Sequence, residues 1–594
     1  MLNKWISFAA SAVLVGTLSG CNSDNDTEAA AQPLDVRFAS IEAPATMGEK
    51  NALQVTDEVI VNGEAQNIGY TKLMATGEEN NGEIYGRLKD KNDIPLTMED
   101  GSPYICNGTS NPDGSGSGLD YFSILQKNGK LYMVSQFECQ IGAYYMSELE
   151  QDAKTGALSV KPGTMRFISQ KEYFGGFVHC AGMKTPWETH LGSEEYPSDA
   201  KLLQEDGTLD PYYDFVEEYW GDLKLSNPYY YGWTPEVSID SNGNPNYTKH
   251  YVLGRLSHEL SYVMPDRKTV YMSDDGTNVG LFMFVADKAE DLSAGTIYAA
   301  KWTQKGTANG GSADISWVAL GHATDAEIRN MLDPDNNVGT NDGIRFDDIM
   351  EIAEANGDGS CPAGYSSINT SAYHECIRVK PGMEKAAAFF ETRRYAAMKG
   401  ATTEFRKEEG ITFDAANNRL YVAMSQVAYG MEDFAKKGKA KRTYDEGGEN
   451  HIRLPYNPCG TVYALDVDSN YRATNMYGVL SGTPIEEDAE GNRCHLDGIS
   501  NPDNVTFLPN SNTLVIGEDT SSHVNNVVWA YDVERKALQR VLTTPLGAEA
   551  TSPFWYNDVN GYGYLTVVTM HPSKSSEELG ESSAGVIGAF KGLK

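Results

Sequence analysis

The chain has 594 residues and a net charge of −35, from 83 acidic against 48 basic residues. This excess of negative charge argues against nucleic acid as a binding partner, because its phosphate backbone would be repelled. With 40% hydrophobic residues, the chain is long enough to bury a large core, as one big domain or several.

The first 20 residues have the features of a bacterial export signal. Lys4 provides the positive start, and residues 6–18 form an apolar run too short to span a bilayer stably. The run ends in Leu-Ser-Gly-Cys, which resembles a lipobox, so we expect cleavage before Cys21 and a lipid on that cysteine.

Residues 21–34 are polar and small, as expected of a flexible acidic tether. No later apolar run reaches membrane length, so we expect residues 35–594 to be exported as a single domain. We also expect this domain to be a monomer. The lipid on Cys21 would anchor this domain outside the cytoplasm, at the outer membrane, on its periplasmic face or at the cell surface.

Most of the remaining chain is predicted to form short strands. A recurring pattern consists of a turn, about five apolar residues and then polar or acidic residues. It occurs at residues 131–134 before Glu138, 270–272 before Asp274 and Asp275, 420–423, 514–516 before Glu518 and Asp519, and 564–568 before His571. Helical periodicity is scarce, and its best candidates are 325–332 and 383–399.

Repeated strands at long, irregular intervals predict an all-β fold, a β-propeller with elaborated blades and long insertions. A plain blade takes about 40–45 residues, so extra strands or insertions must lie between blades. In such a fold equivalent strands end on the same side, and the side chains beyond them converge. Two packed sheets are the structural alternative, which would scatter the acidic residues.

The cysteines point to an oxidising compartment, where thiols pair. If Cys21 carries lipid, seven cysteines remain, and one must be left over. Pairing of sequence neighbours leaves Cys180 as the free thiol and joins the other six as Cys106–Cys139, Cys361–Cys376 and Cys459–Cys494. The alternative for Cys180 is a buried structural thiol or half of a disulfide.

Converging strand ends would bring a thiol and many carboxylates together. Carboxylates in this number can share a site only if cations compensate their charge. Oxygen ligands suit calcium, and a thiolate suits iron or zinc. Any single acid could instead be a turn or rim residue. The converging set is Glu138, Cys180, Glu194, Glu195, Glu259, Asp274, Asp275, Glu408 or Glu409, Asn504, Glu518, Asp519 and Glu549.

Several motifs follow one another along the chain: Cys180-Ala181-Gly182, Thr185-Pro186-Trp187, Glu194-Glu195, Gly254-Arg255-Leu256-Ser257-His258-Glu259, the segment 400–410, Asn501-Pro502-Asp503-Asn504, Gly517-Glu518-Asp519-Thr520 and the segment 547–553. In this order they resemble the PhoX family of exported alkaline phosphatases, and the similarity extends from about Cys106 to Pro572.

The resemblance implies a six-bladed propeller with an iron–calcium centre (Fe3+ and Ca2+) on its axis. Such a centre hydrolyses small-molecule phosphate monoesters, and we expect it to serve phosphate scavenging. Cys180 would bind iron, with Glu259 and Glu409 as iron or bridging carboxylates. Calcium ligands or groups that support them would be Glu138, Glu195, Asp275, Asn504, Glu518, Asp519 and Glu549.

Three further residues have expected catalytic roles. Arg406 and Lys407 stand where the family places a cation for the substrate phosphate, and His258 could act as a general acid or base. Between two adjacent glutamates we prefer Glu409 to Glu408 as a ligand, on the expectation that Gly410 pins a turn.

Two other functions are compatible with the sequence. One is a phosphodiesterase or phosphotriesterase that uses calcium alone, in which Cys180 would be replaceable. The other is a non-catalytic surface lipoprotein whose acidic residues only hold structural calcium.

Overall fold

The structure is a computed structural model that describes residues 33–106, 118–202, 216–573 and 580–593. Residues Leu34–Lys594 cluster into one compact unit. The predicted export signal, Cys21 and nearly all of the tether lie outside the described residues. Among the described residues, no helix combines the length and the apolar character needed to cross a membrane.

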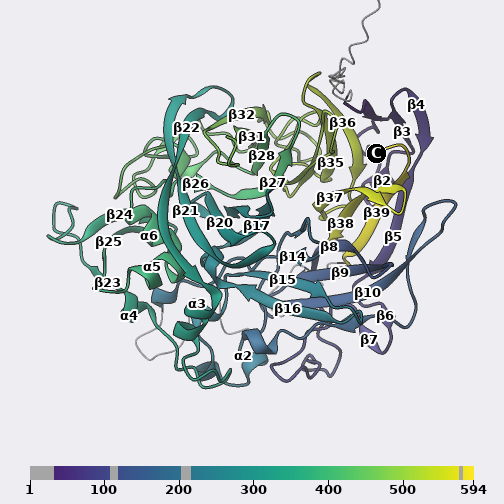
Figure 1. Cartoon of the computed structure of the whole chain (residues 1–594). Coiled ribbons are helices and arrows are strands. Elements are labelled where there is room, and N and C mark those ends of the chain that lie inside the picture. Colours follow the sequence, from purple (N-terminus) through teal and green to yellow (C-terminus); the bar gives the residue numbers. More distant parts are fainter. Residues whose placement is uncertain (1–32, 107–117, 203–215, 574–579, 594) are drawn as a thin grey trace, which may run out of the picture. The chain divides into compact units, whose positions relative to one another are not determined.

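The unit consists mostly of antiparallel strands, which confirms the all-β prediction in its coarse form (Figure 1). In the described part of the chain, five sheets have four strands or more. The first two comprise β8 (Gly118–Lys127), β9 (Lys130–Glu138), β10 (Ala143–Gln151), β11 (Leu158–Val160) and β12 (Arg166–Phe167), and then β13 (Met183–Lys184), β14 (His190–Leu191), β15 (Thr234–Ile239) and β16 (Pro245–His250).

The third sheet contains nine strands that fall into two sequential runs. The first run is β17 (His258–Val263), β18 (Thr269–Asp274), β20 (Phe282–Lys288), β21 (Asp291–Gly306) and β22 (Ser312–Thr324). The second is β27 (Glu408–Asp414), β28 (Arg419–Met424), β31 (Thr461–Asp466) and β32 (Asn475–Ser481). Only a short pairing of residues 312–314 with 475–477 joins the two runs.

The last two large sheets combine both ends of the unit. One contains β33 (Pro502–Phe507), β34 (Thr513–Glu518), β35 (Val527–Asp532), β36 (Ala537–Thr543) and β2 (Gln54–Val55). The other contains β37 (Glu549–Val559), β38 (Tyr562–Met570), β39 (Ser583–Phe590) and β5 (Gly69–Ala75). In Figure 1 the purple β5 accordingly lies beside the yellow β39.

All five predicted strand segments are confirmed, and the turns before them explain where they start. Asn128 and Gly129 both have positive φ, 53° and 73°, as a tight hairpin turn requires. They connect β8 to β9, whose side chains are buried at seven consecutive positions. Burial on both faces explains why the sequence shows an apolar run there rather than alternation.

The helix predicted at 325–332 is confirmed as α3 (Asp325–Leu332). It begins with a capping box, in which Thr324 Oγ1 accepts from the Glu327 amide and Glu327 accepts from the Thr324 amide. The second predicted helix is wrong in one respect. It is broken at Glu391 into α5 (Glu384–Phe390) and α6 (Thr392–Met398).

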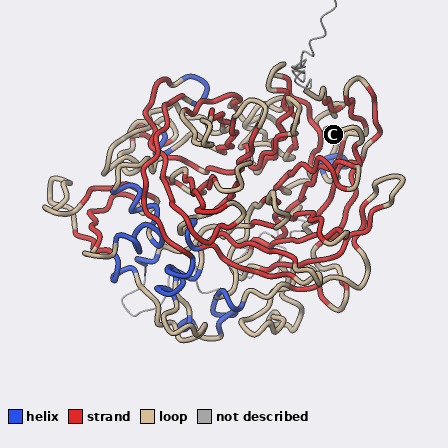
Figure 2. Tube along the Cα trace, viewed as in Figure 1, coloured by secondary structure: helices blue, strands red, loops and turns tan. Residues whose placement is uncertain are grey.

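The break follows from the contacts of Glu391, whose φ and ψ are −120° and 45°. Its buried carboxylate accepts from Tyr229 Oη at 2.7 Å and from Arg394 Nη1 at 2.8 Å. Figure 2 shows most of the helical segments gathered at one side of the unit. α3, α5 and α6 belong to the long insertion between β22 and β27.

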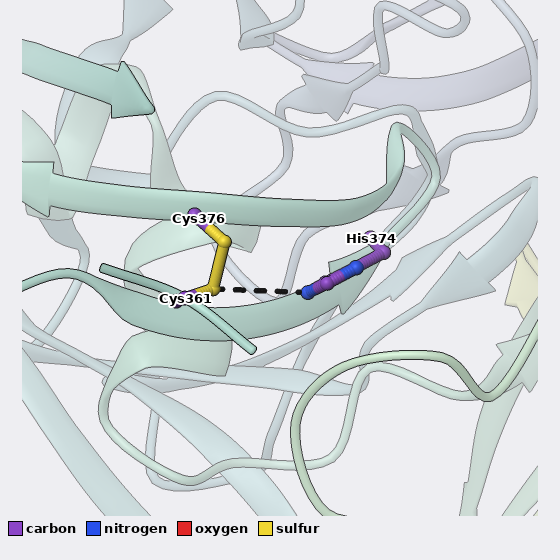
Figure 3. A group of neighbouring side chains, drawn as sticks. All are labelled: Cys361, His374 and Cys376. Atoms are coloured by element: carbon purple, nitrogen blue, oxygen red, sulfur yellow. Dashed lines mark hydrogen bonds between the residues drawn. A yellow bond between two sulfur atoms is a disulfide. The ribbon is translucent and has the colours of Figure 1, made fainter. Parts of the chain in front are cut away.

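The predicted disulfides Cys106–Cys139, Cys361–Cys376 and Cys459–Cys494 are confirmed, and Cys180 is free and buried. Figure 3 shows the second of them, with His374 beside Cys361. Each disulfide closes a loop of 15 to 35 residues, so each restricts the unfolded chain locally.

Buried His250 links β16 to β15 and to α3. Its Nε2 lies 2.7 Å from Glu236 and its Nδ1 lies 3.0 Å from Asp325. Burial alone would lower the pKa of His250, but the two carboxylates outweigh burial and raise it to about 10. The charged His250 and its two carboxylate partners therefore stabilise the folded state fully below the ordinary pKa near 6.5. This stabilisation is lost as the pH rises through about 10.

We predict that His250→Gln lowers the free energy of unfolding by about 3 kcal/mol at pH 6, and by less at pH 10. Denaturant titrations at both pH values measure this difference. His322→Gln is the matched control, because His322 forms an exposed pair with Asp287 and should change stability by less than about 1 kcal/mol. If His250→Gln lowered the free energy of unfolding equally at both pH values, His250 would not be charged in the wild type at pH 6.

Candidate metal centre

Acidic side chains gather where the first strand of a sheet begins and the second strand ends. In an antiparallel pair these two ends lie side by side. The register places Gly118 opposite Glu138, His258 opposite Asp274 and Pro502 opposite Glu518. The ends of second strands, where the sequence predicted convergence, therefore supply only some of the acidic side chains. The starts of the first strands supply others.

Three groups of thiol and carboxylate atoms overlap to form a continuous array. Within each group the ligand atoms lie within 4.8 Å of one another. The groups share Cys180 and Glu259, and every member except half-buried Glu138 is buried. The acidic array, as we call it, consists of Asp120, Glu138, Cys180, Glu195, Glu259, Glu409 and Asp503.

Cys180 and Glu259 lie at the centre of the array. Cys180 Sγ lies 3.0 Å from Glu259 Oε2, and Asn504 Nδ2 donates to Glu259 Oε1 at 2.8 Å. Asn504 Oδ1 in turn accepts from the Ser552 amide at 2.6 Å. Asn504 therefore orients Glu259 from β33, while β17 carries it.

Asp120 and Asp503 belong to the array, but sequence reasoning missed both. Asp120 lies on β8 and accepts from Ser552 Oγ at 2.9 Å and from Thr551 Oγ1 at 3.1 Å. Asp503 directly precedes Asn504 in a motif that had been recognised. An acid at the start of a first strand was the signal that could have identified them.

Gly410 allows β27 to approach β33 closely. A Cβ at Gly410 would lie 2.6 Å from Asn504 Cα, so any larger residue would push the strands apart. The expectation that Gly410 pins a turn is wrong, because it lies within β27. The preference for Glu409 nevertheless agrees with the structure, which brings Glu409 into the array.

Glu408 points to a different environment from Glu409, as alternation along a strand requires. Its side chain is fully buried, and neither carboxylate oxygen has a hydrogen-bond partner among the described residues. Burial, followed by the charge of Asp274, raises the pKa of Glu408 well above its ordinary range.

Lys407 is a cation that contacts both a member of the array and a neighbouring acid. Its Nζ lies 2.9 Å from Asp275 and 3.1 Å from Glu409. Tyr196 Oη also donates to Asp275. Burial alone would raise the pKa of Asp275, but Lys407 and these hydrogen bonds hold it at about 2.

The rest of the array has too little positive charge for its acids. Burial raises the pKa of Asp120, with a further contribution from Glu549, and raises that of Glu409, with a contribution from Asp275, each to about 7. Burial and neighbouring carboxylates raise the pKa values of Cys180 and Glu259 well above their ordinary ranges. Cations bound among these atoms would remove the repulsion.

Several predicted residues have structural partners instead. Both carboxylate oxygens of Glu518 accept hydrogen bonds, from the Ser500 amide, Trp529 Nε1, the Val527 amide and His523 Nδ1. Because the chain itself satisfies this carboxylate, we do not assign Glu518 to the metal centre.

The same holds for Glu194 and Asp274, which form buried ion pairs with Lys249 and Arg393. His258 follows a similar pattern, since its Nε2 lies 2.8 Å from the Gly254 carbonyl oxygen and burial lowers its pKa to about 4. His258 directly precedes Glu259 in the chain but is not among the ligand groups of the array.

A cavity of about 680 Å³ is connected to the array through Lys407, which lines the cavity and contacts Glu409. Arg406, Lys407 and Asp519 line it. Arg406 Nη1 donates to the Gly276 carbonyl at 3.1 Å and to Thr277 Oγ1 at 2.9 Å. Glu549 lies near Asp519 and accepts from His571.

The donor set fits a mixed metal centre. A thiol and six carboxylates provide one soft and several hard ligands, which suit a transition ion and calcium respectively. Cys361, His374 and Cys376 also lie within ligand distance of one another, but their sulfur atoms are bonded together (Figure 3). With both sulfur atoms in a disulfide, that second group contains no thiolate ligand.

Comparison with known proteins identifies the family. The sequence profile of alkaline phosphatase PhoX matches residues 104–563. The chain belongs to the PhoX alkaline phosphatase family. Membership assigns it to the phosphoric ester hydrolases, and the metal dependence of the PhoX family agrees with the candidate ligands. No curated protein sequence is significantly similar to it.

The PhoX fold is shared with a solved structure, Pseudomonas fluorescens PhoX in complex with vanadate, a transition state analogue. The sequences are 16% identical, the match covers 93% of this chain and 98% of the other, and the TM-score is 0.58. A putative 6-phosphogluconolactonase from Bacteroides uniformis aligns over 80% of this chain at 12% identity, with a TM-score of only 0.28.

We predict that this PhoX-family protein loses stability when its metal ions are removed, because the acids of the array then repel one another. A chelator should lower the melting temperature by about 10 °C, and added Ca²⁺ should restore most of the loss. Differential scanning calorimetry measures both changes. A melting temperature that neither chelator nor Ca²⁺ alters would refute a metal-filled array.

Proposed function

We propose that the protein hydrolyses phosphate monoesters outside the cytoplasm at an iron–calcium centre, and that it scavenges phosphate. The observation that carries this proposal is the array of Cys180 with six carboxylates beside a cavity lined by Arg406 and Lys407. PhoX-family membership and the fold shared with a vanadate-bound PhoX support it.

Within this proposal, Cys180, Glu259 and Glu409 would hold Fe³⁺, and the remaining carboxylates would hold Ca²⁺. Bound cations supply Lewis-acid polarisation of the phosphoryl oxygens and charge neutralisation. Glu138, Glu195, Asp120 and Asp503 complete the donor set, and Asp275 supports it through Lys407.

The chain's own residues bind and orient the ester. Arg406 and Lys407 face the cavity and provide the positive charge that attracts a phosphate dianion to a protein of charge −35. The planar Arg406 guanidinium can donate two parallel hydrogen bonds to phosphate oxygens. Lys407 is fixed by Asp275 and Glu409, so its ammonium needs no reorganisation when substrate arrives.

We further propose that the sheets form a six-bladed propeller. Separating the nine-stranded sheet at its short β22–β32 pairing gives six runs of antiparallel strands. Four acids of the array lie on the first strands of four different runs, as expected for an axial site: Asp120, Glu259, Glu409 and Asp503. The three disulfides agree with an extracytoplasmic protein. We propose that it is a monomer anchored through lipid on Cys21.

We predict that the purified protein is coloured by an iron–thiolate centre and hydrolyses 4-nitrophenyl phosphate. Cys180→Ala should bleach the colour and lower kcat/KM by at least about 1000-fold, because the thiolate ligand to iron is lost. Absorption spectra, metal analysis and phosphatase kinetics provide the measurements. Cys180→Ser, which keeps the size of the side chain, controls for packing and should also bleach.

The alternatives give different results in the same experiment. A protein that contains calcium but no iron, and that keeps its activity as Cys180→Ala, would be a calcium-only esterase. A protein that melts in a calcium-dependent way but turns over no phosphate ester would be a binding lipoprotein. Iron that is absent after growth in iron-replete medium would refute the proposed centre.

A further inference from the structure

The cavity beside the acidic array has a charge opposite to that of the protein. Four of its lining residues are cationic and only two, Glu487 and Asp519, are acidic. The whole chain, by contrast, has 48 basic and 83 acidic residues. The cations that line the cavity are Arg406, Lys407, Lys437 and Arg493.

These cations form an inner and an outer pair. Lys407 and its chain neighbour Arg406 form the inner pair, because Lys407 contacts Asp275 and the array member Glu409. Lys437 and Arg493, the outer pair, come from separate loops. The inner pair suffices for one phosphoryl group, so the outer pair has no role in the proposed reaction.

Arg493 is held in place although it is exposed. Its Nη2 donates to the carbonyl oxygen and the hydroxyl of Ser521, at 2.8 and 2.9 Å. The next residue, Cys494, is bonded to Cys459, which fixes the loop. The structure therefore fixes this guanidinium at the cavity wall and reduces the side-chain entropy lost when it binds a ligand.

Lys437 occupies the turn between β29 (Ala435–Lys436) and β30 (Lys439–Ala440), with a φ of 53°. Its amide donates to Glu432 Oε1 at 2.7 Å. Across the residues that the structure describes, neither the Lys437 ammonium nor the Arg493 guanidinium lies within 4.0 Å of a carboxylate oxygen.

Two cations without a carboxylate partner on the wall of one cavity attract an anion. Because the protein as a whole is acidic, an anion is attracted to this cavity more strongly than to the rest of the surface. The cavity volume of about 680 Å³ lies in the range of pockets that enclose whole small molecules. The anion must therefore belong to the leaving group of the ester, because the phosphoryl group is held at the inner pair.

We propose that Arg493 and Lys437 form a subsite for a second phosphate, so that the preferred substrates are small molecules carrying two phosphate groups. This proposal rests on the proposed phosphatase function. Glu487 and Asp519 also line the cavity and disfavour a free carboxylate or a second anion elsewhere along the wall. Sugar bisphosphates and nucleotides share the required chemistry.

The test compares glucose 1,6-bisphosphate with glucose 6-phosphate, using the purified full-length protein and 4-nitrophenyl phosphate as a reporter of basic activity. The wild type should show the higher kcat/KM for the bisphosphate. Arg493→Gln should lower this preference about tenfold, since a hydrogen-bonded charge pair is lost. Lys437→Gln should lower it less, because an ammonium binds phosphate as a point charge.

Lys536→Gln is the matched control, because it removes one exposed positive charge from a residue that does not line the cavity. It should leave all three rates unchanged. Turnover of 4-nitrophenyl phosphate without a preference for the bisphosphate overturns the subsite alone. Equal losses for both glucose esters in Arg493→Gln also overturn it. Failure to hydrolyse any of the three esters refutes the phosphatase function, and the subsite with it.

Discussion

Repulsion among buried carboxylates is the constraint on which the rest of this structure depends. Six carboxylates and one thiol form three overlapping groups, and Lys407 contacts Asp275 and one member of the array, Glu409. A fold that holds such a set together needs rigid supports, and here they are the starts of several antiparallel strands. It also needs bound cations, because burial and mutual repulsion otherwise favour protonated acids.

The acids of the site differ from the structural acids of the fold in how far the chain compensates their charge. Glu518 receives four hydrogen bonds from the chain, and Glu194 and Asp274 each pair with a cation. In the array, Asp120 accepts from two hydroxyl groups and Glu409 pairs with Lys407, yet burial and neighbouring carboxylates still raise the pKa of each to about 7. The negative charge that the chain leaves uncompensated makes such acids suitable ligands for metal ions.

This distinction also sets the limit of prediction from sequence. The odd number of cysteines left after Cys21 singled out Cys180, and acids that follow a strand or the Cys180 motif placed Glu138 and Glu195 near it, because both signals are local in sequence. Asp120 and Asp503 were missed because an acid inside a strand resembles any other strand residue. The sequence also placed Glu518 in the site, because no local pattern reveals that the Trp529 indole reaches it from another strand.

The pairing of β5 with β39 has a consequence for biogenesis. Ala75 is aligned with Ser583, so the last sheet joins segments about 500 residues apart in the chain. Such a sheet cannot form until both of its segments have left the ribosome. The unit therefore closes only after the whole stretch between β5 and β39 has been synthesised.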